Sequence, residues 1–112
     1  QALRADRQSF GAGRRVDDNA HVLLRFQGGA RGMLSASQVA PGNENGLRLR
    51  VYGTKAGLDW RQEDPNAMTL SPLGEPARRI TRGGAGLGSS AGRWTRIPPG
   101  HPEGYLEGFA TL

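Results

Sequence analysis

The segment GHPEGY at residues 100–105 contains the side chain best suited to chemistry in this sequence. Histidine titrates near neutral pH, so an imidazole held in place can hydrogen-bond a substrate hydroxyl or transfer a proton. Gly100 and Pro102 flank His101 and shape its backbone. We therefore take His101 as a candidate substrate-binding residue, with a helix-capping or packing histidine as the alternative.

Two neighbours of His101 are candidates for the same site. Glu103 could face a substrate, although a carboxylate also suits the first turn of a helix, near the positive end of its dipole. Tyr105 could offer its hydroxyl at the edge of a core position. We therefore include Glu103 and Tyr105 among the substrate-binding candidates.

A loop over residues 41–46 is the second polar cluster of interest. It contains Asn43, Glu44 and Asn45. These side chains could hydrogen-bond a sugar-like ligand, but the same residue types form turns on their own because they bond to nearby backbone groups. Asn45 is retained as a candidate substrate contact beside that turn interpretation.

Metal and nucleotide motifs are weak in this sequence. It contains no cysteine, which excludes disulfides, thiolate metal ligands and a cysteine nucleophile. His21 and His101 are far apart, and no ligand spacing typical of a metal site surrounds them. The glycines at 84, 86 and 88 lack the hydrophobic strand and the following helix of a dinucleotide fingerprint. We interpret residues 83–92 as a flexible linker.

The formal net charge of +5 raises the question of a polyanionic partner. The arginines are scattered, and the tightest groups lie at 14–15, 48–50 and 78–79. Aromatic residues make up 6% of the chain, too few and too dispersed to form a stacking platform for bases. An ordinary solvated surface is favoured, and a basic nucleic-acid binder is the weaker interpretation.

Alternating apolar residues predict a β-rich fold. The Gly28-Gly29 pair separates two apolar runs and predicts a two-residue hairpin turn. Small residues on both faces of 31–40 predict a strand that is covered on both sides or closely approached. We expect an open, mainly antiparallel sheet of about six strands in a meander. The predicted strands cover residues 21–26, 31–40, 47–52, 58–62, 68–70 and 77–81.

A helix over residues 102–112, with proline in its first turn, completes an α+β fold class. Residues 1–15 are interpreted as a linker or the tail of a preceding element, and residues 16–112 as one domain. Both ends look like cuts within a longer protein. No apolar run approaches the roughly 20 residues of a membrane span, and no signal peptide opens the chain. We expect a soluble, cytoplasmic domain.

Four segments occur in an order that resembles one family. They are DNAHVLLRF (18–26), GARGMLSASQ (29–38), LRLRVYGTKAGLDW (47–60) and GHPEGYLEGFA (100–110). Together they resemble the C-terminal domain of the glucose–fructose oxidoreductase/inositol dehydrogenase family (Gfo/Idh/MocA). The resemblance covers about residues 16–112.

The resemblance implies an oxidoreductase that uses NAD or NADP and acts on a sugar, an inositol or a related polyol. It implies an N-terminal Rossmann domain as partner and a sheet that supplies much of the substrate site and often forms the subunit interface. The Rossmann fingerprint and the family's Glu-Lys-Pro and Asp-x-x-x-His motifs are absent from this sequence. We therefore expect no catalytic, cofactor-binding or metal-binding residue in this fragment, and no activity from it alone.

The sequence thus predicts a substrate-side and oligomerisation domain of an NAD(P)-dependent dehydrogenase. In the intact enzyme, His101 would orient or protonate a substrate oxygen, and the loop with Asn45 would touch the polyol. A non-catalytic β-sheet module that pairs with another copy of itself is the alternative.

Overall fold

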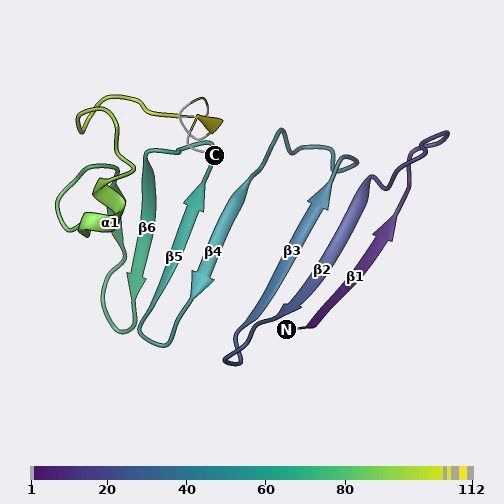
Figure 1. The fold of residues 1–112 in the computed structure, drawn as a ribbon, viewed down its shortest axis with the longest axis horizontal. Helices are drawn as coiled ribbons and strands as arrows, with labels where there is room; N and C mark the ends of the chain where they lie inside the picture. The colour runs from purple at the N-terminus through teal and green to yellow at the C-terminus, as the bar shows by residue number, and fades with distance from the viewer. Residues whose placement is uncertain (1, 105, 107–108, 111–112) are drawn as a thin grey trace. The chain divides into compact units, whose positions relative to one another are not determined.

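The computed structural model describes residues 2–104, 106 and 109–110, which contain seven strands and one short helix (Figure 1). The chain divides into two compact units, Gln1–Glu44 and Asn45–Leu112. Each unit contains one sheet whose strands follow one another in chain order. The elements are β1 (Ala2–Gln8), β2 (Asn19–Arg25), β3 (Arg31–Ser37), β4 (Arg48–Tyr52), β5 (Ala56–Arg61), β6 (Ala67–Pro72), β7 (Arg78–Thr81) and α1 (Ser89–Gly92).

All strand pairs are antiparallel, so the predicted meander and the β-rich fold class are confirmed. The strands form two hydrogen-bonded sheets, of three and four strands, where one sheet was expected. The break falls after β3, where residues 41–46 carry a proline and two glycines with positive φ. Proline offers no ladder donor, and positive φ departs from the extended conformation of a strand.

The β2–β3 hairpin of the first unit forms at the predicted glycine pair, but its loop consists of residues 27–29, where a two-residue turn was predicted. Gly28 and Gly29 have φ of 90° and 93°, a region that favours glycine. The Phe26 N–H donates to the Ala30 carbonyl at 3.0 Å and closes the turn. Val22 lies opposite Leu34 across this hairpin, so their side chains share one face.

Strand β1 lies within residues 1–15, the segment interpreted as a linker or the tail of a preceding element. Ala2–Gln8 pair with β2 along their whole length, which places Leu3 opposite Leu24 and Ala5 opposite Val22. The segment therefore alternates in period two like its neighbour. The strand is exposed along its whole length and carries Arg4, Asp6 and Arg7. These charged residues conceal the alternation in the sequence.

The four-stranded sheet of the second unit has one apolar face. Its register aligns Leu49, Trp60, Met68 and Ile80 across β4 to β7. Residues that alternate with them, such as Asp59, point to the opposite face. The clear alternation of residues 47–52 predicted β4 correctly, and the structure confirms strands at 58–62, 68–70 and 77–81 within one to two residues at most boundaries.

The segment after β7 is more ordered than the linker predicted over 83–92. It contains α1, a single turn that begins after Gly88. Leu87 and Ala91 line a pocket together with Met68 and Ile80. The segment folds back over the apolar face because it carries the apolar side chains that cover part of it.

Apolar burial is thin in both units. Among the described residues, Ala67 is the one buried hydrophobic residue, at 8% exposure. Strand β3 is exposed except at Gly32, so the predicted cover on both sides is not met within this chain. The predicted close approach to this strand is present at Gly32, where an added Cβ would lie 3.1 Å from Phe26 Cε2.

The helix predicted over 102–112 begins later than Pro102. Residues 102–104 have no regular secondary structure, whereas Leu106 and Phe109 are helical, and the Ala110 N–H donates to the Leu106 carbonyl at 2.9 Å. The rest of that prediction lies outside the described residues. No helix in the part of the chain that the structure describes has the length and apolarity to cross a membrane.

Candidate functional site

Arg82, immediately after β7, organises the candidate site. Its Nη1 donates to the Ile97 carbonyl at 2.9 Å. Its Nη2 donates to the carbonyls of Pro98 at 3.2 Å and His101 at 2.6 Å. Its Nε donates to Asn66 Oδ1 at 3.3 Å. One guanidinium therefore ties the backbone around His101 to the end of the sheet.

Glu103 forms an ion pair with Arg82. Its Oε2 lies 2.7 Å from Arg82 Nη1, and the two side chains are 6% and 16% exposed. Its Oε1 accepts the Arg96 N–H at 3.1 Å. The Glu103 N–H donates to Asn66 Oδ1 at 3.2 Å, so the same amide oxygen also anchors this segment. The carboxylate thus faces the interior of the network, where substrate-contact and first-turn roles were the sequence-based expectations.

His101 sits on a shaped turn with its side chain exposed. Its N–H donates to the Pro98 carbonyl at 3.3 Å, and its own carbonyl accepts from Arg82. Gly100 has a φ of 86°, which an L side chain rarely adopts. The backbone of the turn is therefore fixed while the imidazole is accessible.

The other predicted site residues are not brought into this network. Asn45 is exposed in its loop, and no hydrogen bond or ion pair joins it to His101 or Glu103 in the described chain. Its neighbour Asn43 donates through Nδ2 to the Ala40 carbonyl at 3.4 Å, which is turn chemistry. Tyr105 lies outside the described residues.

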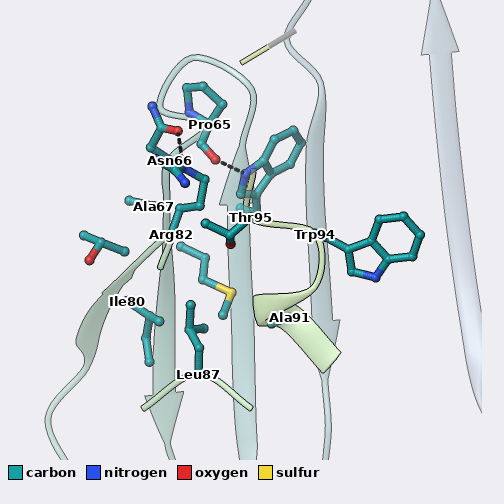
Figure 2. A pocket seen from close by; sticks show the side chains of 12 residues that line it. Pro65, Asn66, Ala67, Ile80, Arg82, Leu87, Ala91, Trp94 and Thr95 are labelled. Atoms are coloured by element: carbon teal, nitrogen blue, oxygen red, sulfur yellow. Dashed lines mark hydrogen bonds between the residues drawn. The ribbon is translucent and has the colours of Figure 1, made fainter. Parts of the chain in front are cut away.

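A pocket of about 230 Å³ opens beside the network, on the apolar face of the sheet (Figure 2). Asn66 and Arg82 form part of its wall, and the Trp60 indole N–H donates to the Pro65 carbonyl at its rim at 3.1 Å. Figure 2 shows the indole of Trp94 directed away from the other lining side chains, and it is 67% exposed. The pocket is lined mainly by apolar groups. Asn66 and Arg82, the side chain that binds the His101 carbonyl, are among its polar lining residues.

The opposite face of the same sheet is charged. Arg48 pairs with Asp59 across β4 and β5. The hydrogen bonds from Arg48 hold the pKa of the Asp59 carboxyl below its usual value. A hollow of about 390 Å³ on this face is lined by Asp59, Arg61, Thr69 and Arg79, among others. No group of three metal-ligating side chains is gathered anywhere in residues 2–104, 106 and 109–110.

Arg82 and Asn66 were missed by sequence reasoning. Each acts through bonds to backbone groups or side chains distant in the sequence, and such pairings leave no local spacing to detect. The one available signal is the place of Arg82 directly after a short strand and before Gly83-Gly84.

Comparison with known proteins gives a consistent result. The model of the GFO/IDH/MocA C-terminal domain matches residues 1–59. The uncharacterized oxidoreductase YfiI of Bacillus subtilis (strain 168) is 36% identical over 111 residues, which are 98% of this chain and 28% of that protein. The chain thus spans less than a third of the length of this curated relative.

Two solved structures are similar over nearly the whole chain. An oxidoreductase from Sinorhizobium meliloti is 60% identical, with a TM-score of 0.89 over 98% of this chain and 33% of that one. An inositol dehydrogenase homolog from Azotobacter vinelandii, complexed with NADH and myo-inositol, is 37% identical, with a TM-score of 0.87. That match covers 98% of this chain and 29% of the other.

Proposed function

Because this chain belongs to the Gfo/Idh/MocA C-terminal domain family, we propose that it is the substrate-side domain of an NAD(P)-dependent oxidoreductase. Its substrate is a sugar, an inositol or a related polyol. The observation that carries this proposal is the similarity, over 98% of the chain, to an inositol dehydrogenase homolog complexed with NADH and myo-inositol. The exposed imidazole of His101, on a backbone fixed by Arg82, supports a role in holding a substrate oxygen.

The described residues do not fit a dinucleotide. A phosphate cradle needs a glycine-rich turn that opens a helix directly after a strand. Here β7 ends at Thr81, and the glycines that follow lead to α1, which has only four residues. We propose that NAD or NADP is held by a Rossmann domain outside residues 1–112, as the 28% coverage of the curated relative supports.

We propose that His101 forms a hydrogen bond with a substrate oxygen. A neutral imidazole accepts a hydrogen bond from a polyol hydroxyl, and a protonated one donates to a substrate oxygen. Asn45 and Tyr105 are proposed as further substrate contacts. Glu103, whose carboxylate is buried against Arg82, contributes by holding the turn that carries His101.

A second role is proposed for the sheets, which pair with another copy of the protein. Leu49 and Val51 of β4 are 61% and 51% exposed on the apolar face, and Met33 of β3 is 74% exposed. Exposed apolar surface of this kind marks interaction sites in folded proteins. An oligomerisation role and a substrate role are compatible in one domain.

The test uses the full-length protein that contains this chain. Reduction of NAD and of NADP is followed with myo-inositol and a panel of other polyols and sugars, for the wild type and for His101→Ala. We expect turnover with at least one polyol and a loss of kcat/KM in His101→Ala. His21→Ala, at the other exposed histidine, is the matched control and should keep wild-type kinetics. Absence of turnover with every polyol and either cofactor refutes the dehydrogenase proposal.

A further inference from the structure

We propose that Arg82 is a positioning residue, which sets the place of His101 through the backbone of residues 97–101. This inference rests on the proposed substrate role of His101. It assigns a function to a side chain that is not itself placed in contact with substrate. Glu103 and Asn66 are part of the same arrangement, because they hold the Arg82 guanidinium in one orientation.

The first step of the argument is the convergence of acceptors on one side chain. The carbonyls of Ile97, Pro98 and His101 all accept N–H groups from Arg82. A planar guanidinium offers five N–H donors in a fixed fork, so it can satisfy several acceptors at once with a defined geometry. A lysine ammonium at this position could not reproduce that arrangement.

The second step is the way in which Arg82 itself is fixed. The Glu103 carboxylate lies 2.7 Å from Nη1, and Asn66 Oδ1 accepts from Nε. Both charged side chains are largely buried, at 16% and 6% exposure. Electrostatic attraction is stronger away from water. The fork therefore has one preferred orientation.

The third step separates positioning from support of the sheet. The backbone N–H of Arg82 donates to the Asn66 carbonyl at 2.8 Å, and this bond survives any side-chain substitution. The pairs that join β4 to β7 are backbone pairs that involve no Arg82 side-chain atom. Loss of the fork is therefore expected to loosen the His101 turn while the sheet persists.

The pocket wall supplies a further consequence. Asn66 and Arg82 line the pocket on the apolar face, and Figure 2 shows the hydrogen bond between them at its polar end. The groups that orient the His101 turn thus also shape this end of the pocket. A substitution at Arg82 changes both together, whereas a substitution at His101 changes only the exposed imidazole.

The test compares Arg82→Lys with Arg79→Lys in the full-length protein. Arg79 carries the same charge and lies in β7, three residues before Arg82, but its pair with Asp64 is exposed, at 62% and 60%. Amide hydrogen exchange is measured for Arg96, His101 and Glu103 and for the strands of the sheet. In Arg82→Lys we expect exchange at those three amides to rise by at least about tenfold, with β5 and β6 unchanged. Arg79→Lys should match the wild type at all of them.

Kinetics decide whether Arg82 acts through His101. We expect Arg82→Lys to lower kcat/KM for the polyol by roughly 10- to 100-fold, because displacement of a substrate-facing group by a fraction of an ångström is costly. In a His101→Ala background the same substitution should cost little more, since the group that it positions is already gone. An equal loss in both backgrounds overturns the inference, and so does wild-type exchange in Arg82→Lys.

A second variant keeps the test decisive if Arg82→Lys does not fold. Glu103→Gln has nearly the same shape and removes only the charge that orients the guanidinium, so the same exchange pattern is expected with a smaller rise.

The outcomes also separate this inference from the proposed function. If His101→Ala has wild-type kinetics while the turn loosens in Arg82→Lys, the substrate role of His101 is refuted, but Arg82 still positions the backbone of the turn. If the turn does not loosen in Arg82→Lys, the positioning role of Arg82 is refuted, whatever the kinetics of His101→Ala.

Discussion

Arg82 and Glu103 form an ion pair of 2.7 Å in which the two side chains are only 16% and 6% exposed. Arg79, which lies in β7 three residues before Arg82, pairs with Asp64 at a similar distance of 2.6 Å, but with 62% and 60% exposure. Water screens the exposed pair, whereas removal of one partner from the buried pair leaves the other charge without solvation. These two ion pairs of the second unit therefore have like chemistry and different surroundings.

Removal of the Glu103 carboxylate should destabilise the second unit strongly. Glu103→Ala leaves the Arg82 guanidinium buried without its counter-charge and the Arg96 N–H without its acceptor. We expect a loss of about 3 kcal/mol in the free energy of unfolding, measured by urea denaturation of the full-length protein. Asp64→Ala, the matched exposed carboxylate, should cost no more than about 1 kcal/mol. Equal losses in the two variants contradict the role assigned to burial.

Asp18 should make the first unit sensitive to acid. Its carboxylate, 3% exposed, accepts the N–H groups of Phe10 at 2.8 Å and Gly11 at 2.7 Å. These two bonds, and to a lesser degree Arg14, hold the pKa of Asp18 below its usual 3.8 although burial opposes them. A carboxyl whose pKa is lower in the folded state stabilises the fold above its usual pKa, and this contribution is lost as pH falls through the folded-state value.

The measurement is the thermal midpoint of the wild type and of Asp18→Asn from about pH 5 down to about pH 2.5. We expect Asp18→Asn to be less stable at pH 5 and the gap to narrow as the wild-type carboxyl takes up its proton. Asp17→Asn removes the same charge from the adjacent exposed residue, which pairs with Arg7 at 3.1 Å, and should change the midpoint less. A gap that stays constant with pH counts against the account.

Gly100 should be needed for the conformation of the His101 turn. Its φ is 86°, and a Cβ there would meet no heavy atom within 4 Å, so the cost of Gly100→Ala is conformational and not steric. We expect about 1–2 kcal/mol of local strain and faster amide exchange at His101. Gly104→Ala, at a glycine with equal space and no positive φ, is the control. Similar exchange in both variants shows that the turn tolerates a side chain.

Local patterns in the sequence predicted most of the fold, and long-range pairing accounts for what they missed. The alternation around Val22 and the glycine pair at 28–29 are local signals, and the hairpin forms where they place it. Strand β1 went unrecognised because its outward side chains are charged and its partner, β2, lies beyond a turn. The short helix α1 follows a glycine-rich run. Its Ala91 lines the pocket together with Met68 and Ile80, which lie too far away in the sequence for a local pattern to reveal the grouping.

The candidate site divides in the same way. Gly100 and Pro102 mark a shaped backbone around His101, and the structure places a turn there. The sequence does not reveal which of the fourteen arginines pairs with Glu103. The pair with Arg82 depends on how the segment that contains Glu103 folds against the end of β7. A residue type gives the chemistry available, whereas burial and partners decide which chemistry is used.

The exposed apolar face of β4 should govern self-association. Val51→Glu would place an unpaired charge in an apolar contact between copies, which is strongly unfavourable. We therefore expect the full-length protein to sediment as an oligomer and Val51→Glu to sediment as a smaller species. Arg50→Glu, at the adjacent exposed position on the opposite face, changes the charge by more and should leave the oligomer intact if the apolar face forms the contact. A wild-type protein that stays monomeric at high concentration, or an unchanged mass in Val51→Glu, removes this face as the interface.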